Sequence, residues 1–247
     1  MTGGHIGYRI LRVIAPRSKP FSQSSDNEES DNKLEQFFGD SFFQLIKGKT
    51  VIDFGCGTGG QSVEMAKQGA KVIGIDIQES QIKLCQQRAQ HANVADLCEF
   101  TTETNELADI LISKDAFEHF DDPAGILQIM STLLKPEGYV LAAFGPTWLH
   151  PYGGHLFSIF PWSHLLFSEK SQVRWRSDFK FDGATRFSEI DGGLNQLTIS
   201  QFEKIIADSP FQIEWLETIP IKGIPLFKTR VLREFGSSIV RCKLILK

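Results

Sequence analysis

Several features that would place this sequence in a specialised class are scarce or absent. Its 247 residues include four cysteines, whose spacing fits neither close disulfide pairs nor a zinc finger: Cys56, Cys85, Cys98 and Cys242. No apolar run approaches the length of a membrane span, and the first residues lack the charged-then-apolar layout of a signal peptide. We therefore expect free thiols, no stable membrane insertion and a cytoplasmic location.

An excess of positive charge is also missing, since the formal net charge is −4. Nucleic-acid-binding proteins usually present a basic face, so we expect no nucleic-acid partner. The slight excess of acidic residues also argues mildly against binding to an anionic membrane. The remaining composition is that of an ordinary globular protein, 41% hydrophobic and 23% charged, with 20 phenylalanines against 3 tyrosines. Phenylalanine in that number fills a core or lines an apolar pocket.

Short apolar runs alternate with helical patterns along the middle of the chain. This alternation predicts an α/β fold, a Rossmann-like, doubly wound and mostly parallel seven-stranded sheet with helices on both faces. The last two runs, FQIEWLETI and SSIVRCKLIL, are predicted to close the sheet as an antiparallel pair. The other strands are expected at 50–54, 70–77, 97–101, 107–113 and 139–145, and helices at 34–48 and 123–135 among others.

Composition divides the chain into an N-terminal arm (1–33), a core (34–145), an inserted aromatic-rich lid (146–196) and a C-terminal part of the core sheet (197–247). In the arm, GYRILRVIAPR is either a helix that caps a pocket or touches a membrane surface, or a loosely docked segment. A polar, acid-rich stretch follows it.

The lid aromatics form either a small core or a wall around substrate. Its stretch RWRSDFKFDGATR is either an anion contact or a solvated face.

A glycine-rich loop, GCGTGG, follows the first predicted strand and opens a helix. Asp53 ends that strand, and Asp76 ends the next one at a distance suited to ribose hydroxyls. Glycine is needed where a backbone adopts unusual dihedral angles or lies flat against a ligand. The spacing differs from the dinucleotide fingerprint, and Asp53 would repel a pyrophosphate but attract an ammonium group. A ligand with a ribose and a cationic amino-acid end fits this pattern.

Four segments carry a family resemblance: VIDFGCGTGG, VIGIDIQES, LADILISKDAFEHF and LLKPEGYVLAAFG. Over about residues 45–145 the chain resembles the class I S-adenosylmethionine-dependent methyltransferases, specifically the small-molecule type 11 branch. The resemblance implies that the methionine end of S-adenosyl-L-methionine lies at the loop, its ribose at Asp76 and its adenine on Ile77. Glu103 or Thr104 would replace an acid that the family carries near the adenine. The implied cofactor set is Asp53, Gly55, Cys56, Gly57, Gly59, Asp76, Ile77 and Glu103.

The stretch KDAFEHF follows a central strand and places three ionisable residues at i, i+3 and i+4. In a helix, Asp115, Glu118 and His119 would project from one face. The carboxyl ends of the strands are where open α/β sheets bind ligands, so we expect these side chains at the pocket. They would bind a metal ion, act directly in acid–base chemistry, or serve as a scaffold.

An acid-x-x-Glu-His segment with a later Gly-x-His is similar to the metal-dependent O-methyltransferases, although Asp115 stands where the first Glu is usual. By that resemblance Asp115, Glu118, His119 and His155 would ligate Mg²⁺, Mn²⁺ or another divalent ion that lowers the pKa of the acceptor hydroxyl. His150 and His164 are further histidines in the same region. The predicted catalytic residues are His119, His155 and Glu118.

These observations predict an S-adenosylmethionine-dependent enzyme that methylates a hydroxyl on a small, partly apolar molecule. Metal-free C- or N-methylation and a non-catalytic cofactor-binding partner subunit remain alternatives. An RNA-end methyltransferase is disfavoured because the sequence has no contiguous basic arm. The sequence specifies neither the acceptor nor the oligomeric state.

Overall fold

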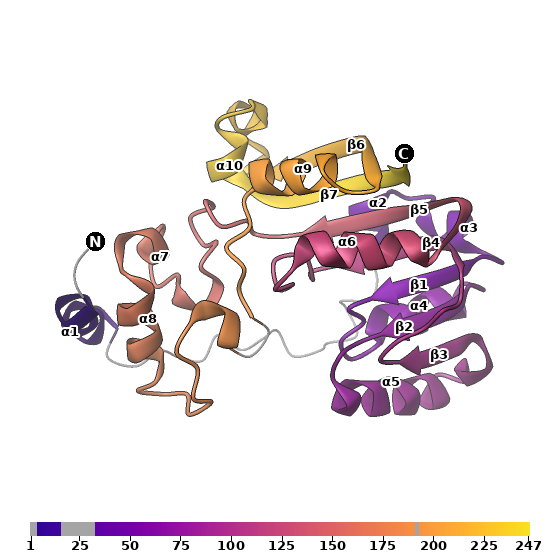
Figure 1. Ribbon diagram of the computed structural model, residues 1–247, viewed down its shortest axis with the longest axis horizontal. Helices are drawn as coiled ribbons and strands as arrows, with labels where there is room; N and C mark the ends of the chain where they lie inside the picture. Colours follow the sequence, from indigo (N-terminus) through magenta and orange to yellow (C-terminus); the bar gives the residue numbers. More distant parts are fainter. Residues whose placement is uncertain (1–3, 16–32, 191–192) are drawn as a thin grey trace.

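A computed structural model describes residues 4–15, 33–190 and 193–247, and it contains one large sheet with a lobe at its side (Figure 1). The sheet has seven strands in the order β3-β2-β1-β4-β5-β7-β6. Their bounds are β1 Thr50–Phe54, β2 Lys71–Ile75, β3 Cys98–Thr101, β4 Ala108–Lys114, β5 Leu134–Phe144, β6 Phe211–Pro220 and β7 Ser237–Leu246.

Strands β1 to β5 pair in parallel, whereas β7 runs antiparallel to both β5 and β6. The predicted Rossmann-like sheet with an antiparallel C-terminal pair is therefore confirmed. Five parallel strands end at one edge of the sheet, and the loops that follow β1, β2 and β4 meet there.

Alternating side chains of the strands belong to two apolar layers, one on each face of the sheet. From β1, Ile52 and Phe54 pack in the layer of α6 (Pro123–Thr132) and α9 (Ile199–Ala207). Val51 packs in the opposite layer, which includes helices α2 (Lys33–Phe38), α3 (Phe42–Ile46), α4 (Gly60–Lys67) and α5 (Glu79–His91). Burial of both faces explains why the strands are near-continuous apolar runs.

Two predicted helices have different bounds in the structure. The helix expected over 34–48 is divided into α2 and α3 at Gly39, whose φ of 100° lies outside the helical region. The helix expected over 123–135 ends at Thr132, because Leu134 already begins β5 and pairs with Ala108. Short 3₁₀ turns at η2 (Ala95–Leu97), η5 (Ile221–Gly223) and η6 (Pro225–Lys228), and helix α10 (Arg233–Gly236), complete the connections of this part.

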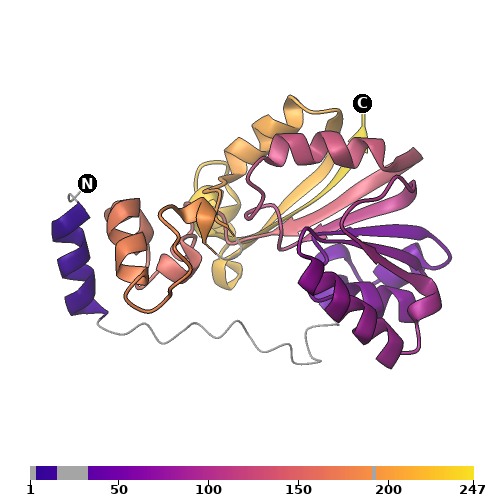
Figure 2. The same cartoon turned by 60° about the horizontal axis from the view of Figure 1, so that its bottom comes forward.

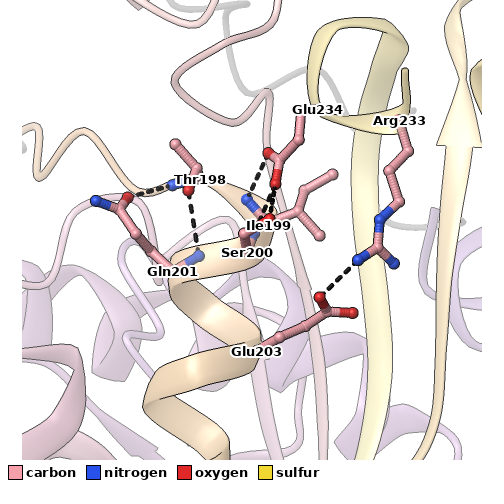
Figure 3. Close-up of polar contacts among 7 residues, drawn as sticks. All are labelled: Thr198, Ile199, Ser200, Gln201, Glu203, Arg233 and Glu234. Atoms are coloured by element: carbon pink, nitrogen blue, oxygen red, sulfur yellow. Dashed lines mark hydrogen bonds and ion pairs between the residues drawn. The ribbon is translucent and has the colours of Figure 1, made fainter. Parts of the chain in front are cut away.

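Glu234 of α10 links the C-terminal connection to the start of α9 (Figure 3). Its buried carboxylate accepts hydrogen bonds from the Ile199 and Ser200 amides, at 3.0 and 2.7 Å, which are among the orphan donors of a helix N-terminus. Thr198 and Gln201 form a capping box on the same turn. These bonds fix the segment that enters α9 from the lobe.

The lobe consists of η3 (His155–Phe157), α7 (Ser163–Leu166), α8 (Glu169–Arg176) and η4 (Phe187–Glu189). It has its own apolar core, which includes Phe157, Val173 and Phe187. Several lid aromatics are therefore core residues, as one of the two sequence interpretations proposed. Arg176 fits neither interpretation of its basic stretch, because it is buried and its guanidinium pairs with Asp182.

Helix α1 (Gly4–Ile14) packs against α8 at the end of the molecule (Figure 2). The indole Nε1 of Trp175 donates to the Ala15 carbonyl at 2.9 Å, and the Tyr8 hydroxyl donates to Asp178 at 3.1 Å. The N-terminal stretch is thus a docked helix. The acid-rich segment predicted after it lies mostly at 16–32, outside the described residues. In the described part, no helix is long and apolar enough to span a bilayer.

Candidate functional site

The glycine loop between β1 and α4 has the backbone conformation that its sequence indicates. Gly55, Gly57 and Gly59 all have positive φ, at 83°, 53° and 76°. A Cβ on Gly59 would lie 2.8 Å from the Cys85 sulfur of α5, so this glycine allows close packing. A Cβ on Gly57 would meet no atom within 4 Å, so this glycine faces open space where a ligand can approach the backbone.

Asp76, at the end of β2, ties two loops together. Its Oδ2 accepts a hydrogen bond from the Gly57 amide at 3.0 Å, and its Oδ1 accepts one from the Gln78 amide at 2.9 Å. The carboxylate is half-buried, and each oxygen retains acceptor capacity for a ligand hydroxyl. Its position beside Gly57 suits the predicted ribose contact.

Asp53 is more deeply placed than a direct ligand contact would require. Its Oδ2 accepts a hydrogen bond from the Ser62 hydroxyl of α4 at 2.5 Å, and the side chain is buried. Burial raises the pKa of this carboxyl to about 6, while the Ser62 hydrogen bond opposes that rise. A cationic group bound near the loop would stabilise the ionised carboxylate. The predicted ammonium contact therefore stays a prediction.

The remaining predicted cofactor residues lie around the loop. Ile77 is 90% exposed directly after β2, and Glu103 is exposed in the loop after β3. Cys56 is half-buried within the glycine loop. An exposed apolar side chain such as Ile77 is available to pack against a flat ring. Their roles toward an adenine stay predictions.

KDAFEHF does not form the predicted helix: residues 115–120 are a turn, with one i to i+3 bond from the His119 amide to the Ala116 carbonyl. The prediction was wrong because Asp115 has a left-handed φ of 53°, which prevents helical continuation from β4. Its carboxylate pairs with Lys114 and is about half exposed. Asp115 therefore does not share a helical face with Glu118 and His119.

Glu118 points into the protein. Its Oε1 accepts a hydrogen bond from the Gly145 amide at 3.2 Å, and its buried Oε2 has no partner among the described residues. Burial raises the pKa of this carboxyl to about 8, with Asp115 adding to the rise. The side chain is thus mainly protonated and neutral at pH 7.

His119 and His155 lie face to edge, with ring centroids 5.6 Å apart. The Nδ1 of His119 lies 3.0 Å from the Gly193 carbonyl, which only accepts, so in the neutral form of the ring Nδ1 carries the proton and Nε2 the lone pair. The Nε2 of His155 is buried without a hydrogen-bond partner in the described chain. Burial lowers the pKa of His155 to about 4, so its ring is neutral at pH 7.

The four predicted metal ligands are not arranged as a ligand set. Across residues 4–15, 33–190 and 193–247, no three His, Cys, Asp or Glu side chains are grouped for a metal ion. Glu118 and His155 each have an unpartnered buried atom, but Asp115 is turned to Lys114. His150 and His164 have partners inside the lobe, at the Tyr152 amide and the Trp148 carbonyl. Metal binding stays a prediction.

Sequence reasoning missed Asn195, which follows the lobe and clasps the 115–120 turn. Its side-chain amide donates to the carbonyls of Phe117 and Phe120, at 2.6 and 2.9 Å. Its backbone amide donates to the carbonyl of Glu118. Nothing in the sequence around Asn195 signals this role, because its partners are about 75 positions away. Asn195 thus positions the turn that carries Glu118 and His119.

The geometry agrees with comparisons to known proteins. Residues 45–145, from α3 to the end of β5, match the family model described as a methyltransferase domain. This matched region is less than half of the chain, and within it the chain is similar to a methyltransferase domain. The matched region carries both the glycine loop and the 115–120 turn, whereas the lobe with His155, and Asn195 after the lobe, lie outside the match.

Curated relatives are similar over the same part of the chain. The ubiquinone biosynthesis O-methyltransferase of Acinetobacter baylyi is 36% identical over 102 residues, which cover 38% of this chain and 43% of the relative. The protein of the same name from Leptothrix cholodnii is 34% identical over 121 residues, covering 44% of this chain and 47% of the relative. The match thus spans less than half of either relative.

Solved structures share the fold over most of the chain. Magnesium protoporphyrin IX methyltransferase from Synechocystis, with bound SAH, aligns at a TM-score of 0.52 and 19% identity, covering 99% of this chain and 95% of that one. Geranyl diphosphate C-methyltransferase from Streptomyces coelicolor aligns at a TM-score of 0.55 and 15% identity, and the alignment covers 84% of this chain and 79% of that one. At these identities the likeness establishes the fold alone.

Proposed function

We propose that this protein transfers a methyl group from S-adenosylmethionine to a hydroxyl oxygen of a small, partly apolar molecule. One contact supports the proposal above all. A Cβ on Gly55 would lie 3.1 Å from the Ala116 Cβ, so the cofactor loop and the 115–120 turn touch. The turn that carries His119 thus adjoins the loop that would hold the methyl donor, at the ligand-binding edge of the sheet.

The residues present fit the cofactor. Gly57 leaves its backbone open to a ligand, and Asp76 offers acceptor oxygens for ribose hydroxyls. When bound, S-adenosylmethionine supplies an electrophilic methyl group on a sulfonium. The relatives named O-methyltransferases support oxygen as the methyl acceptor, although the match covers less than half of each.

In this proposal His119 is the general base. Its Nδ1–H donates to the Gly193 carbonyl, so Nε2 accepts the proton of the acceptor hydroxyl as the oxygen–methyl bond forms. His155 is neutral and packs beside the His119 ring, so it adds no positive charge that would make His119 a weaker base. Because Glu118 is mainly protonated, it places no negative charge next to His119 that would disfavour deprotonation of the hydroxyl.

The experiment uses S-adenosylmethionine labelled on its methyl group and a panel of phenols, catechols and aliphatic alcohols. Calorimetry measures cofactor binding to the wild type, Asp76→Ala and, as a matched control, Asp96→Ala, which lies on η2 away from the loop. We expect label on oxygen, weaker cofactor binding by Asp76→Ala, and unchanged binding by the control. Label on carbon or nitrogen would exclude the oxygen assignment, and cofactor binding without any product would favour the partner-subunit alternative.

Metal assistance is tested separately, since the predicted ligands are not grouped. The labelled-methyl assay is repeated after chelation with EDTA and after return of Mg²⁺, Mn²⁺ or Zn²⁺. Full activity in EDTA would remove the metal prediction. Activity lost in EDTA and restored by one ion would require Asp115 to turn from Lys114 toward His119.

A further inference from the structure

Helix α1 lies at one end of the molecule, with α8 between it and the rest of the chain (Figure 2). Gly7 and Leu11 form its buried side. Gly4 also lies close to α8, since a Cβ there would be 3.6 Å from the Lys170 Cβ. The helix is therefore covered along one side only, and the remainder of its circumference is surface.

Part of the exposed surface of α1 is apolar, contrary to the usual pattern of a surface helix. Positions 6, 10, 13 and 14 fall within one arc of a helix with 100° per residue. Their side chains are exposed, at 62% for Ile6, 38% for Ile10, 82% for Val13 and 51% for Ile14. Four β-branched residues on one outward arc are hard to explain by chance surface exposure.

A basic strip runs beside this apolar arc. The surface has a hollow of about 680 Å³, lined by His5, Tyr8, Arg9, Arg12, Val13 and Arg174. Arg174 stacks over the Tyr8 ring, with its guanidinium carbon 4.4 Å from the ring centroid. Asp178 pairs with Arg12, but among the described residues neither Arg9 nor Arg174 has an acidic partner. The α1 sequence itself contains no acidic residue.

We propose that the outer face of α1 and its arginine hollow bind the surface of an anionic phospholipid bilayer. The isoleucines and valine enter the boundary between headgroups and acyl chains, and the arginines pair with headgroup phosphates. This arrangement, an apolar arc flanked by cations on a helix parallel to the surface, matches the requirements of interfacial binding. The binding is peripheral and adds to the proposed activity without depending on it.

Charge selects the bilayer over other occupants of this face. The chain has a net charge of −4, so a second copy of it would be an acidic protein partner. The hollow, however, presents its arginines directly beside the apolar arc. This arrangement suits a planar partner that is both apolar and anionic. The overall acidity does not oppose this, since surface charges act within about 10 Å at 0.1 M salt.

The test is sedimentation of the full chain with vesicles. Wild type is mixed with vesicles of phosphatidylglycerol and phosphatidylcholine, and with phosphatidylcholine alone, at 0.1 M and 0.5 M salt. We expect binding to the anionic vesicles, at least tenfold weaker binding to neutral ones, and weakening at high salt. No binding to anionic vesicles, or equal binding to both kinds, would overturn the proposal.

Two variants separate the apolar and the basic contributions. Ile6→Ser with Val13→Ser removes the two most exposed apolar side chains, and Arg9→Glu reverses the exposed cation. Each is expected to weaken anionic-vesicle binding about tenfold or more. The matched controls are Ile129→Ser, half exposed on α6, and Lys83→Glu, exposed on α5, both of which should bind as the wild type does.

Thermal unfolding checks that each variant keeps its fold, since every substituted side chain is on the surface. Vesicle binding unchanged in both α1 variants would overturn the proposal. Analytical ultracentrifugation without lipid provides a second check. If the wild type forms a dimer and the double serine variant does not, the apolar arc is an interface between copies, and the proposal is overturned.

Discussion

The glycine loop at residues 55–59 and the turn at residues 115–120 lie side by side at the sheet edge but are held by different means. The loop is fixed locally, by positive-φ glycines and by Asp76 one strand away. The turn is fixed from a distance, by Asn195 and the Gly193 carbonyl, which follow the lobe. The cofactor side of the site is thus built within the region that matches the methyltransferase domain, whereas the acceptor side also needs the segment that follows the lobe.

The largest expected effect separates chemistry from cofactor binding. His119→Ala should lower kcat by about 10²–10⁴-fold, the usual contribution of a general base, while the Kd for S-adenosylmethionine stays unchanged. His119→Gln can still donate to the Gly193 carbonyl but offers no base, so it should be as inactive as the alanine variant. Steady-state kinetics and calorimetry measure both quantities. A glutamine variant near wild-type activity would assign His119 a scaffold role.

The next effect tests whether the segment after the lobe holds the acceptor side. Asn195→Ala leaves the Phe117 and Phe120 carbonyls without their donor, and we expect about 2 kcal/mol less unfolding free energy and roughly tenfold lower kcat. Asn195→Asp should be worse, because its carboxylate faces the same carbonyls. Urea unfolding and kinetics provide the measurements. The Kd for the cofactor should not change in either variant, and a parallel loss of cofactor affinity would contradict the division between the two sides.

A smaller effect concerns pH and the cofactor side. The pKa of Asp53 is raised by burial from 3.8 in the unfolded chain to about 6, so the folded state holds a proton more tightly. The contribution of Asp53 to stability is therefore full below pH 3.8 and is lost as pH rises through about 6. Asp53→Asn should flatten this part of the stability curve, measured by urea unfolding of the cofactor-free protein from pH 4 to 7. Curves of equal slope would contradict the assignment.

The smallest effect lies at the loop rim. Ile77→Ser should leave the unfolding free energy unchanged, because the side chain is 90% exposed, but weaken cofactor binding several-fold if it packs on the adenine. Phe181→Ser is the matched control, since its side chain is similarly exposed but in the lobe. Equal cofactor affinity in both variants would remove Ile77 from the predicted site.

Patterns with local causes were predictable from the sequence. The strands are predicted by apolar runs, because both faces of the sheet are buried and few strand positions can be polar. Val51, Ile52 and Leu111 are examples of such buried strand residues. The glycine loop is predicted because its conformation needs glycine at particular positions, whatever lies around it. The helix expected at KDAFEHF is the counterexample. Its spacing fits a helix, yet the left-handed Asp115 and the clasp by Asn195 make it a turn.

By itself the sequence determined the α/β sheet, the antiparallel end and the cofactor loop, because apolar periodicity and glycine placement act over a few residues. Only the tertiary structure decided which histidine nitrogen carries a proton, that Glu118 is buried, and that Asp115 faces Lys114. Those outcomes depend on partners such as Gly193, 74 positions from His119. The protonation of a side chain is set by its dielectric surroundings and its hydrogen-bond partners, and the folded chain brings both from a distance.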